Sequence, residues 1–96
     1  MRKSNTQPLG DVIHDYLKSL DIDNKLQEIR LIDNWPKVVG LSVAKKTDRL
    51  FIKNRVLFVY LNSSIVRSEL LRIREGLIKA LNDQAGMKLI DEIVFR

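Results

Sequence analysis

Hydrophobic residues recur every three or four positions along the first half of the chain, the period of an α-helix with one apolar face. From Pro8 to Leu20 this stripe predicts a first helix, because proline suits the first helical turn, where its missing N–H is not needed. A second helix is predicted from about Asn24 to Lys46, since Asn24 and Gln27 stand in a capping-box arrangement. The apolar stripe of the second helix is expected to face the core and begins with Leu26, Ile29, Ile32 and Trp35.

Two residues interrupt the second predicted helix. Pro36 lacks a backbone donor, so we expect a kink or a restart there, with Asn34 as a possible new cap. Gly40 lowers helix propensity, which indicates either close approach of another element or a loop between two short helices. Trp35, the only tryptophan, is interpreted as a core anchor rather than a surface on which bases stack.

The segment 47–62 predicts a tight β-hairpin, because residues with high strand propensity lie on both sides of positions 53–55. The second strand is apolar on both faces and is expected at the centre of the sheet. The first strand is expected at the edge, with Arg49, Phe51 and Lys53 on one face and Leu50 and Ile52 on the other. Core packing is the favoured interpretation for Phe51 and Tyr60, and stacking on bases is the alternative.

A third long helix is predicted after residues 62–64, which offer N-cap side chains, and it is expected to stop before Gly86. Its expected core stripe is Val66, Leu70, Ile73, Leu77 and Leu81. A last strand is predicted within Lys88 to Arg96. The fold class is therefore α+β in the order α-α-β-β-α-β, a small three-stranded sheet packed with helices. At 96 residues the chain suits one domain over 8–96, preceded by a flexible tail over 1–7.

Positive charge is concentrated in the middle of the chain. The net charge is +5, and residues 1–36, 37–79 and 80–96 carry −1, +7 and −1. A solvated surface and a nucleic-acid footprint both explain this pattern. The candidate nucleic-acid-binding residues are the ten basic side chains of the middle segment: Lys37, Lys45, Lys46, Arg49, Lys53, Arg55, Arg67, Arg72, Arg74 and Lys79.

Catalytic and metal-binding patterns are missing from the sequence. The chain has no cysteine and a single histidine, His14, and it contains no phosphate-binding glycine loop or hydrolase motif. We therefore expect no enzymatic activity, no cofactor and no metal. No stretch is long and apolar enough to span a membrane, and the first ten residues do not form a signal peptide, so a cytoplasmic protein without membrane contact is expected.

An ordered set of short motifs resembles the DciA-like family of bacterial proteins. The set includes Trp35-Pro36-Lys37-Val38-Val39-Gly40, then Val56-Leu57-Phe58-Val59, then Ser63-Ser64, and finally Ile90 to Arg96. The resemblance covers Pro8 to Arg96 and implies a KH-like fold, DNA binding, and a role in loading the DnaB-type replicative helicase. Helicase-loading members carry a further segment after this domain, so the resemblance implies nucleic-acid binding more directly than helicase loading.

True KH domains hold the nucleic-acid backbone with a GxxG loop, which this sequence lacks. Binding is therefore expected to come from the dispersed cations and to be salt-sensitive and weakly sequence-specific. The favoured hypothesis is a non-enzymatic nucleic-acid-binding protein acting in replication, with DNA preferred and RNA as a variant. The alternative is an adaptor whose basic face meets an acidic protein partner such as the helicase.

Overall fold

The computed structural model describes the backbone of residues 9–96 and the side chains of Ile13, Ser19, Leu20 and residues 22–96. The expected tail over 1–7 and the side chain of His14 lie outside this description. The elements are α1 (Leu9–Asp33), α2 (Trp35–Val39), α3 (Leu41–Lys45), β1 (Thr47–Lys53), β2 (Val56–Leu61), α4 (Ser64–Arg72), α5 (Arg74–Ala85) and β3 (Glu92–Phe95). None of the described helices has the length and apolar character needed to cross a membrane.

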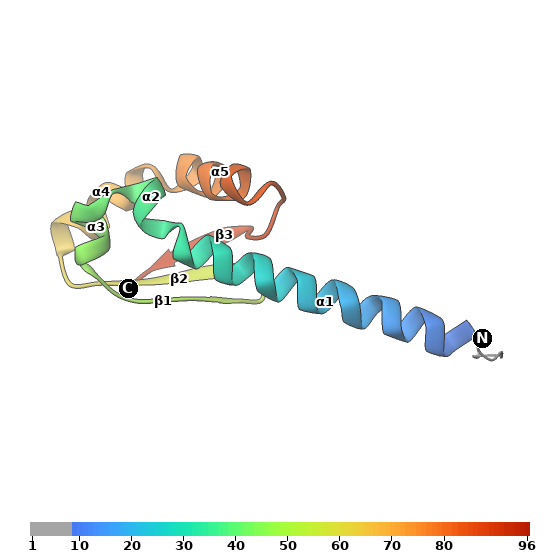
Figure 1. Cartoon of the computed structure of the whole chain (residues 1–96). Helices are drawn as coiled ribbons and strands as arrows, with labels where there is room; N and C mark the ends of the chain where they lie inside the picture. The colour runs from blue at the N-terminus through green and yellow to red at the C-terminus, as the bar shows by residue number, and fades with distance from the viewer. Residues whose placement is uncertain (1–8) are drawn as a thin grey trace.

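The three strands form a mixed sheet in the order β1-β2-β3, with β1 antiparallel and β3 parallel to β2. The described helices lie on one side of this sheet, and its opposite side is open (Figure 1). The predicted α+β class and element order are confirmed, as are the central position of the second strand and the edge position of the first. The last strand is shorter than predicted, because residues 88–91 form a loop before it.

A two-residue turn joins β1 to β2, which confirms the predicted tight hairpin. Asn54 and Arg55 both have positive φ angles, 51° and 65°. This is the geometry of a type I′ turn, whose twist matches that of the flanking strands. Asparagine adopts this conformation readily, whereas arginine does so only under local constraint.

The core lies between the helix-facing side of the sheet and the helices above it. Leu57, Val59 and Leu61 of β2 point into the core and alternate with partly exposed residues on the other face. Trp35 is 2% exposed, which confirms its prediction as a core anchor. Its indole Nε1–H donates to Thr47 Oγ1 at 3.1 Å, and that hydroxyl donates to the carbonyl of Val43 at 3.0 Å. One buried side chain therefore links α2, the end of α3 and the start of β1.

The predicted break between the first two helices is wrong. Helix α1 runs without interruption through residues 21–24 as far as Asp33. Cap-forming residues favour a helix start by about 1 kcal/mol but do not force one. Because this segment contains neither glycine nor proline, nothing in it prevents the helix from continuing.

The predicted core-facing stripe of this region is wrong at its first two positions, although Trp35 at its end is buried. Leu26 and Ile29 are 47% and 57% exposed, whereas Leu31, which lies outside that stripe, is 2% exposed. At about 100° per residue, Leu26 and Ile29 are only about 60° apart around the axis of α1, and both lie on the side opposite Leu31. Because α1 ends at Asp33, Trp35 reaches the core from the next helix, α2.

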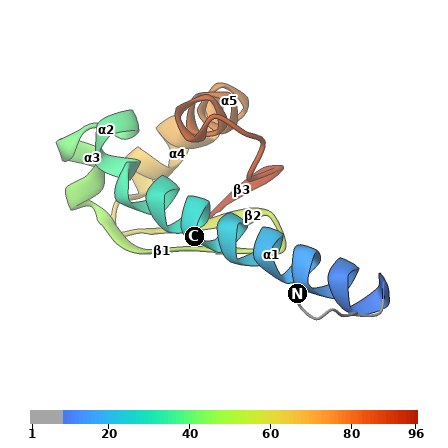
Figure 2. The ribbon, with the colours of Figure 1, turned by 45° about the vertical axis from the view of Figure 1, so that its right-hand side comes forward.

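The first half of α1 projects beyond the sheet and the other helices (Figures 1 and 2). The longest axis of the molecule is 61 Å, and its radius of gyration is 17.9 Å, against about 12–13 Å for a compact chain of this length. Ile13, Leu20 and Ile22 on this half of the helix are each more than two-fifths exposed. These three apolar residues therefore lie on the surface, whereas Leu31 near the end of α1 belongs to the core.

The chain restarts at Pro36, as expected, and divides again at Gly40. Asn34 occupies the N-cap position of α2, but its side chain makes no capping hydrogen bond. Gly40 has φ 92° and separates α2 from α3, which confirms the loop alternative. No heavy atom lies within 4 Å of the point that a Cβ would occupy at this position, so close approach is not the reason for this glycine.

The long helix predicted before Gly86 is two helices, because the chain bends at Ile73. The backbone of Ile73 leaves the helical range at φ −107° and ψ 16°, and its side chain is 55% exposed instead of lying in the core. The predicted ends are correct. Ser63 Oγ accepts a hydrogen bond from the N–H of Val66 at 3.3 Å, and Gly86 adopts the left-handed conformation at φ 75°.

Replacing Trp35 by alanine should lower the free energy of unfolding by about 3–5 kcal/mol, because a large buried side chain leaves a cavity. Trp35→Phe keeps an aromatic ring and loses the hydrogen bond to Thr47, so its cost should be about 1–2 kcal/mol. Urea unfolding followed by circular dichroism measures both values. Equal stability of the wild type and Trp35→Ala would contradict the central place of this residue.

Candidate nucleic-acid interface

The ten candidate cations divide into two groups by their contacts within the chain. Four of them bond to other parts of the molecule: Arg55, Arg67, Arg74 and Lys79. The other six form no ion pair or side-chain hydrogen bond with the residues that the structure describes: Lys37, Lys45, Lys46, Arg49, Lys53 and Arg72. All six are exposed.

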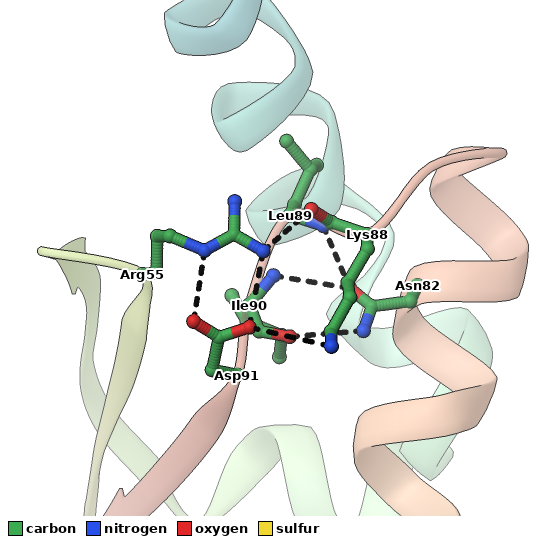
Figure 3. Close-up of polar contacts among 6 residues, drawn as sticks. All are labelled: Arg55, Asn82, Lys88, Leu89, Ile90 and Asp91. Atoms are coloured by element: carbon green, nitrogen blue, oxygen red, sulfur yellow. Dashed lines mark hydrogen bonds and ion pairs between the residues drawn. The ribbon is translucent and has the colours of Figure 1, made fainter.

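Arg55 is fixed by the loop that precedes β3 (Figure 3). Its guanidinium donates to both carboxylate oxygens of Asp91, at 2.9 and 3.0 Å, and to the carbonyl of Lys88 at 2.9 Å. These hydrogen bonds lower the pKa of Asp91 and raise the pKa of Arg55. The Arg55–Asp91 pair stabilises the fold fully at pH values above the pKa of an aspartate in the unfolded chain. This stabilisation is lost as the pH falls through the lowered pKa that Asp91 has in the fold. The pair holds the turn residue in its positive-φ conformation and ties the hairpin to β3.

Asn82 of α5 holds the other side of the same loop. Its Oδ1 accepts from the N–H groups of Leu89 and Ile90 at 3.0 and 3.1 Å, and its Nδ2 donates to the carbonyl of Ile90 at 2.9 Å (Figure 3). These bonds satisfy backbone groups next to two fully buried side chains. Sequence reasoning missed Asn82, because a polar residue near a helix end gives no sign of which backbone groups it will meet.

Arg67 joins α4 to the ends of two strands. Its guanidinium donates to the carbonyl of Leu61 at 3.0 Å and to that of Arg96 at 3.2 Å. Arg74 Nη1 lies 3.5 Å from Glu92 Oε1. Lys79 Nζ lies 2.8 Å from Oδ2 of Asp83 on the next turn of α5. The latter two pairs are exposed and contribute little to stability.

Four of the six remaining cations belong to the helices at one end of the sheet, where α2, α3 and α4 lie (Figure 1). Lys37, Lys45 and Arg72 occupy the last turns of these helices, and Lys46 follows α3 directly. The helices enclose an apolar groove of about 250 Å³ lined by Val38, Val39, Val43, Val66, Glu69, Leu70, Ile73 and Leu77. Cations in last turns also offset the helix dipole, which is a structural reason for their positions.

The open side of the sheet carries the two other cations and three aromatic rings. Arg49 is paired with Tyr60, and Phe51 is paired with Phe58, so these four side chains share one face of β1 and β2. The Phe51 and Phe58 rings are stacked with centroids 4.9 Å apart, and the Phe51 and Tyr60 rings are 6.1 Å apart. The favoured interpretation of Phe51 and Tyr60 as core residues is wrong, because both lie on the face turned away from the helices and are partly exposed.

A comparison with protein-family models matches residues 8–95 to the family described as "Dna[CI] antecedent, DciA". The chain belongs to the DciA family. This family is linked to the loading of the replicative helicase and is regulatory rather than catalytic, and it associates with that helicase. The comparison with curated proteins gave no match.

The DciA-family match spans every element described above, from α1 to β3. It confirms the resemblance seen in the sequence. Among the described residues of this DciA-family chain, no three His, Cys, Asp or Glu side chains gather closely enough to hold a metal ion. The described surface offers six exposed cations, an aromatic sheet face and a projecting helix.

Arg67 and Arg72 lie on the same helix and allow a matched comparison. Arg67→Ala removes two hydrogen bonds from a charged donor and should lower the free energy of unfolding by about 1–3 kcal/mol. Arg72→Ala removes an exposed side chain without such bonds and should change stability by less than about 0.5 kcal/mol. Urea titrations of both variants measure these free energies of unfolding. Equal losses of stability in the two variants would contradict the division of the cations into bonded and unbonded groups.

Proposed function

We propose that this DciA-family protein is a non-enzymatic nucleic-acid-binding factor that assists the replicative helicase in the cytoplasm. DNA is the favoured ligand, because the family acts in replication, and RNA is the variant. The main observation behind the proposal is the set of six exposed cations without a carboxylate partner in the described part of the chain.

The positions of these cations support contact with phosphates. Lys45 and Lys46 are adjacent and exposed where α3 leads into β1, while Lys37 and Arg72 belong to neighbouring helices at the same end of the sheet. An extended nucleic-acid backbone crossing this end would meet several positive charges in succession. Such binding releases counterions from the phosphates, so affinity would fall steeply with salt and depend little on sequence.

The candidate cations that bond to other parts of the molecule have a different role in this proposal. Arg55 and Arg67 hold the hairpin and the strand ends in place, so they shape the surface without being needed for phosphate contact. Lys79 is paired with Asp83 on α5, so its charge is already partly neutralised within the chain. The proposed contact region is therefore narrower than the ten candidates.

Reversing the charge of Lys45 and Lys46 together to glutamate should weaken binding to single-stranded DNA about tenfold or more at low salt. It should also reduce the slope of log affinity against log salt by about 1–2, because up to two phosphate contacts are lost. Fluorescence anisotropy at several salt concentrations measures both quantities.

The matched control is Lys79→Glu with Lys88→Glu, which changes the net charge equally near the C-terminal end of α5. This control should keep most of the wild-type salt slope. An equal loss of DNA affinity in both double variants would show that net charge alone governs binding. That result would contradict the proposed contact region around Lys45 and Lys46.

A second candidate function is protein adaptation through the projecting helix α1. Ile22, Leu26 and Ile29 are spaced four and three residues apart, and each is about half exposed. They form one apolar stripe on the side of α1 opposite the buried Leu31. Exposed apolar stripes of this kind serve as contact surfaces for other proteins, and the family's association with the replicative helicase makes that helicase the expected partner.

Replacing Ile22 and Ile29 by serine should weaken binding to the purified helicase about tenfold or more, since it removes two apolar side chains from the stripe. Leu41→Ser with Ile65→Ser is the matched control, because both side chains are equally apolar, highly exposed and outside α1. Nuclease-treated samples in a binding assay separate protein contact from bridging by DNA. Similar affinities for the two variants would contradict this role of α1.

A further inference from the structure

We propose that the open face of the sheet is a stacking platform for the bases of a single-stranded nucleic acid. This inference rests on the proposed nucleic-acid binding and adds a second site to it. The platform consists of Phe51, Phe58 and Tyr60, with Arg49 beside the rings.

The geometry of the rings suits planar ligands. Phe51 stacks with both other rings, with interplanar angles of 14° to Phe58 and 23° to Tyr60, so the plane of Phe51 is nearly parallel to each of them. Cross-strand pairing between Phe51 and Phe58 fixes the spacing of the two rings through the backbone. The ordered backbone holds the rings in position before any ligand arrives, which lowers the entropy cost of binding.

The rings make little contribution to the core. Residues on the helix-facing side of β1 and β2 pack against the buried cluster, whereas Phe51, Phe58 and Tyr60 do not. Aromatic side chains are costly to leave partly in water without a partner. Their pairing across the strands stabilises the sheet itself, and their partly exposed surfaces stay available for a ligand.

The charge of this face favours a nucleic acid over an apolar protein surface as the occupant. The Arg49 guanidinium lies 4.7 Å from the centroid of Phe51 and 5.7 Å from that of Tyr60. Lys53 is exposed on the same face by strand alternation, and both cations lack a carboxylate partner among the described residues. Rings for bases next to cations for phosphates are the combination that single-strand-binding surfaces use.

The platform also differs in kind from the cations of α2, α3 and α4. Phosphate contacts respond to salt and are indifferent to the presence of bases, whereas stacking needs bases and is nearly independent of salt. A strand crossing from the helical end onto the sheet would meet Arg49 first, since β1 begins directly after Lys46. The two sites would then bind one ligand through different chemical groups.

The test compares two fluorescent single strands with equal numbers of phosphates, one with normal bases and one abasic. The wild-type protein should bind the normal strand about 5- to 100-fold more tightly for each stacked base. In Phe51→Leu with Tyr60→Leu this preference should largely disappear, while the salt slope stays unchanged. The control, Phe51→Tyr with Tyr60→Phe, keeps both rings and should retain the preference.

Equal wild-type affinity for the two strands, with both bindings salt-dependent, would overturn the platform and leave the proposed phosphate contacts standing. If the wild-type protein bound neither strand at low salt, both the stacking platform and the proposed phosphate contacts would be overturned. The wild-type comparison requires no substitution, so it decides the question even where circular dichroism shows that the leucine variant is unfolded. Sedimentation that shows ring-dependent dimers, together with no base preference, would assign the face to a second copy of the chain and overturn the inference.

Discussion

The burial of Trp35 against the start of the sheet determines how the rest of the chain is arranged. Trp35 opens α2 directly after the long N-terminal helix, and its indole donates a hydrogen bond to Thr47, the first residue of β1. Thr47 in turn bonds to the carbonyl of Val43, so the two short helices between Trp35 and the sheet are held in one arrangement. These contacts position α2, α3 and the start of β1 relative to one another.

Two polar anchors hold the opposite end of the sheet. Arg55 and Asn82 bind the loop before β3 from its two sides, and together they allow Leu89 and Ile90 to be buried in a segment without regular structure. This arrangement explains why charge alone is a poor guide to the interface. Arg55 belongs to the same positive segment as Lys53, yet one secures the fold and the other is exposed and unpaired among the described residues.

The surface left by this framework offers three kinds of chemistry in separate places. Cations surround the end where α2, α3 and α4 lie, aromatic rings occupy the open sheet face, and aliphatic residues line the projecting α1. Under the proposed function, the chain contacts both a nucleic-acid strand and a protein. Separate surfaces would let the two contacts form together, because neither would cover the other.

The sequence by itself determined the α+β class, the hairpin, the central second strand and the burial of Trp35, because these depend on local propensity and strong apolar patterns. It did not show that the later helix bends at Ile73, since no glycine or proline marks the bend, and the cap-forming residues at 21–24 predicted a break where α1 is continuous. The sequence also could not show that Arg67 is hydrogen-bonded within the fold while Arg72 is exposed. Nor could it show that Phe51 and Tyr60 lie on the open face of the sheet instead of in the core. Only the tertiary structure decides which side of a strand meets the helices and which backbone carbonyl lies within reach of a guanidinium.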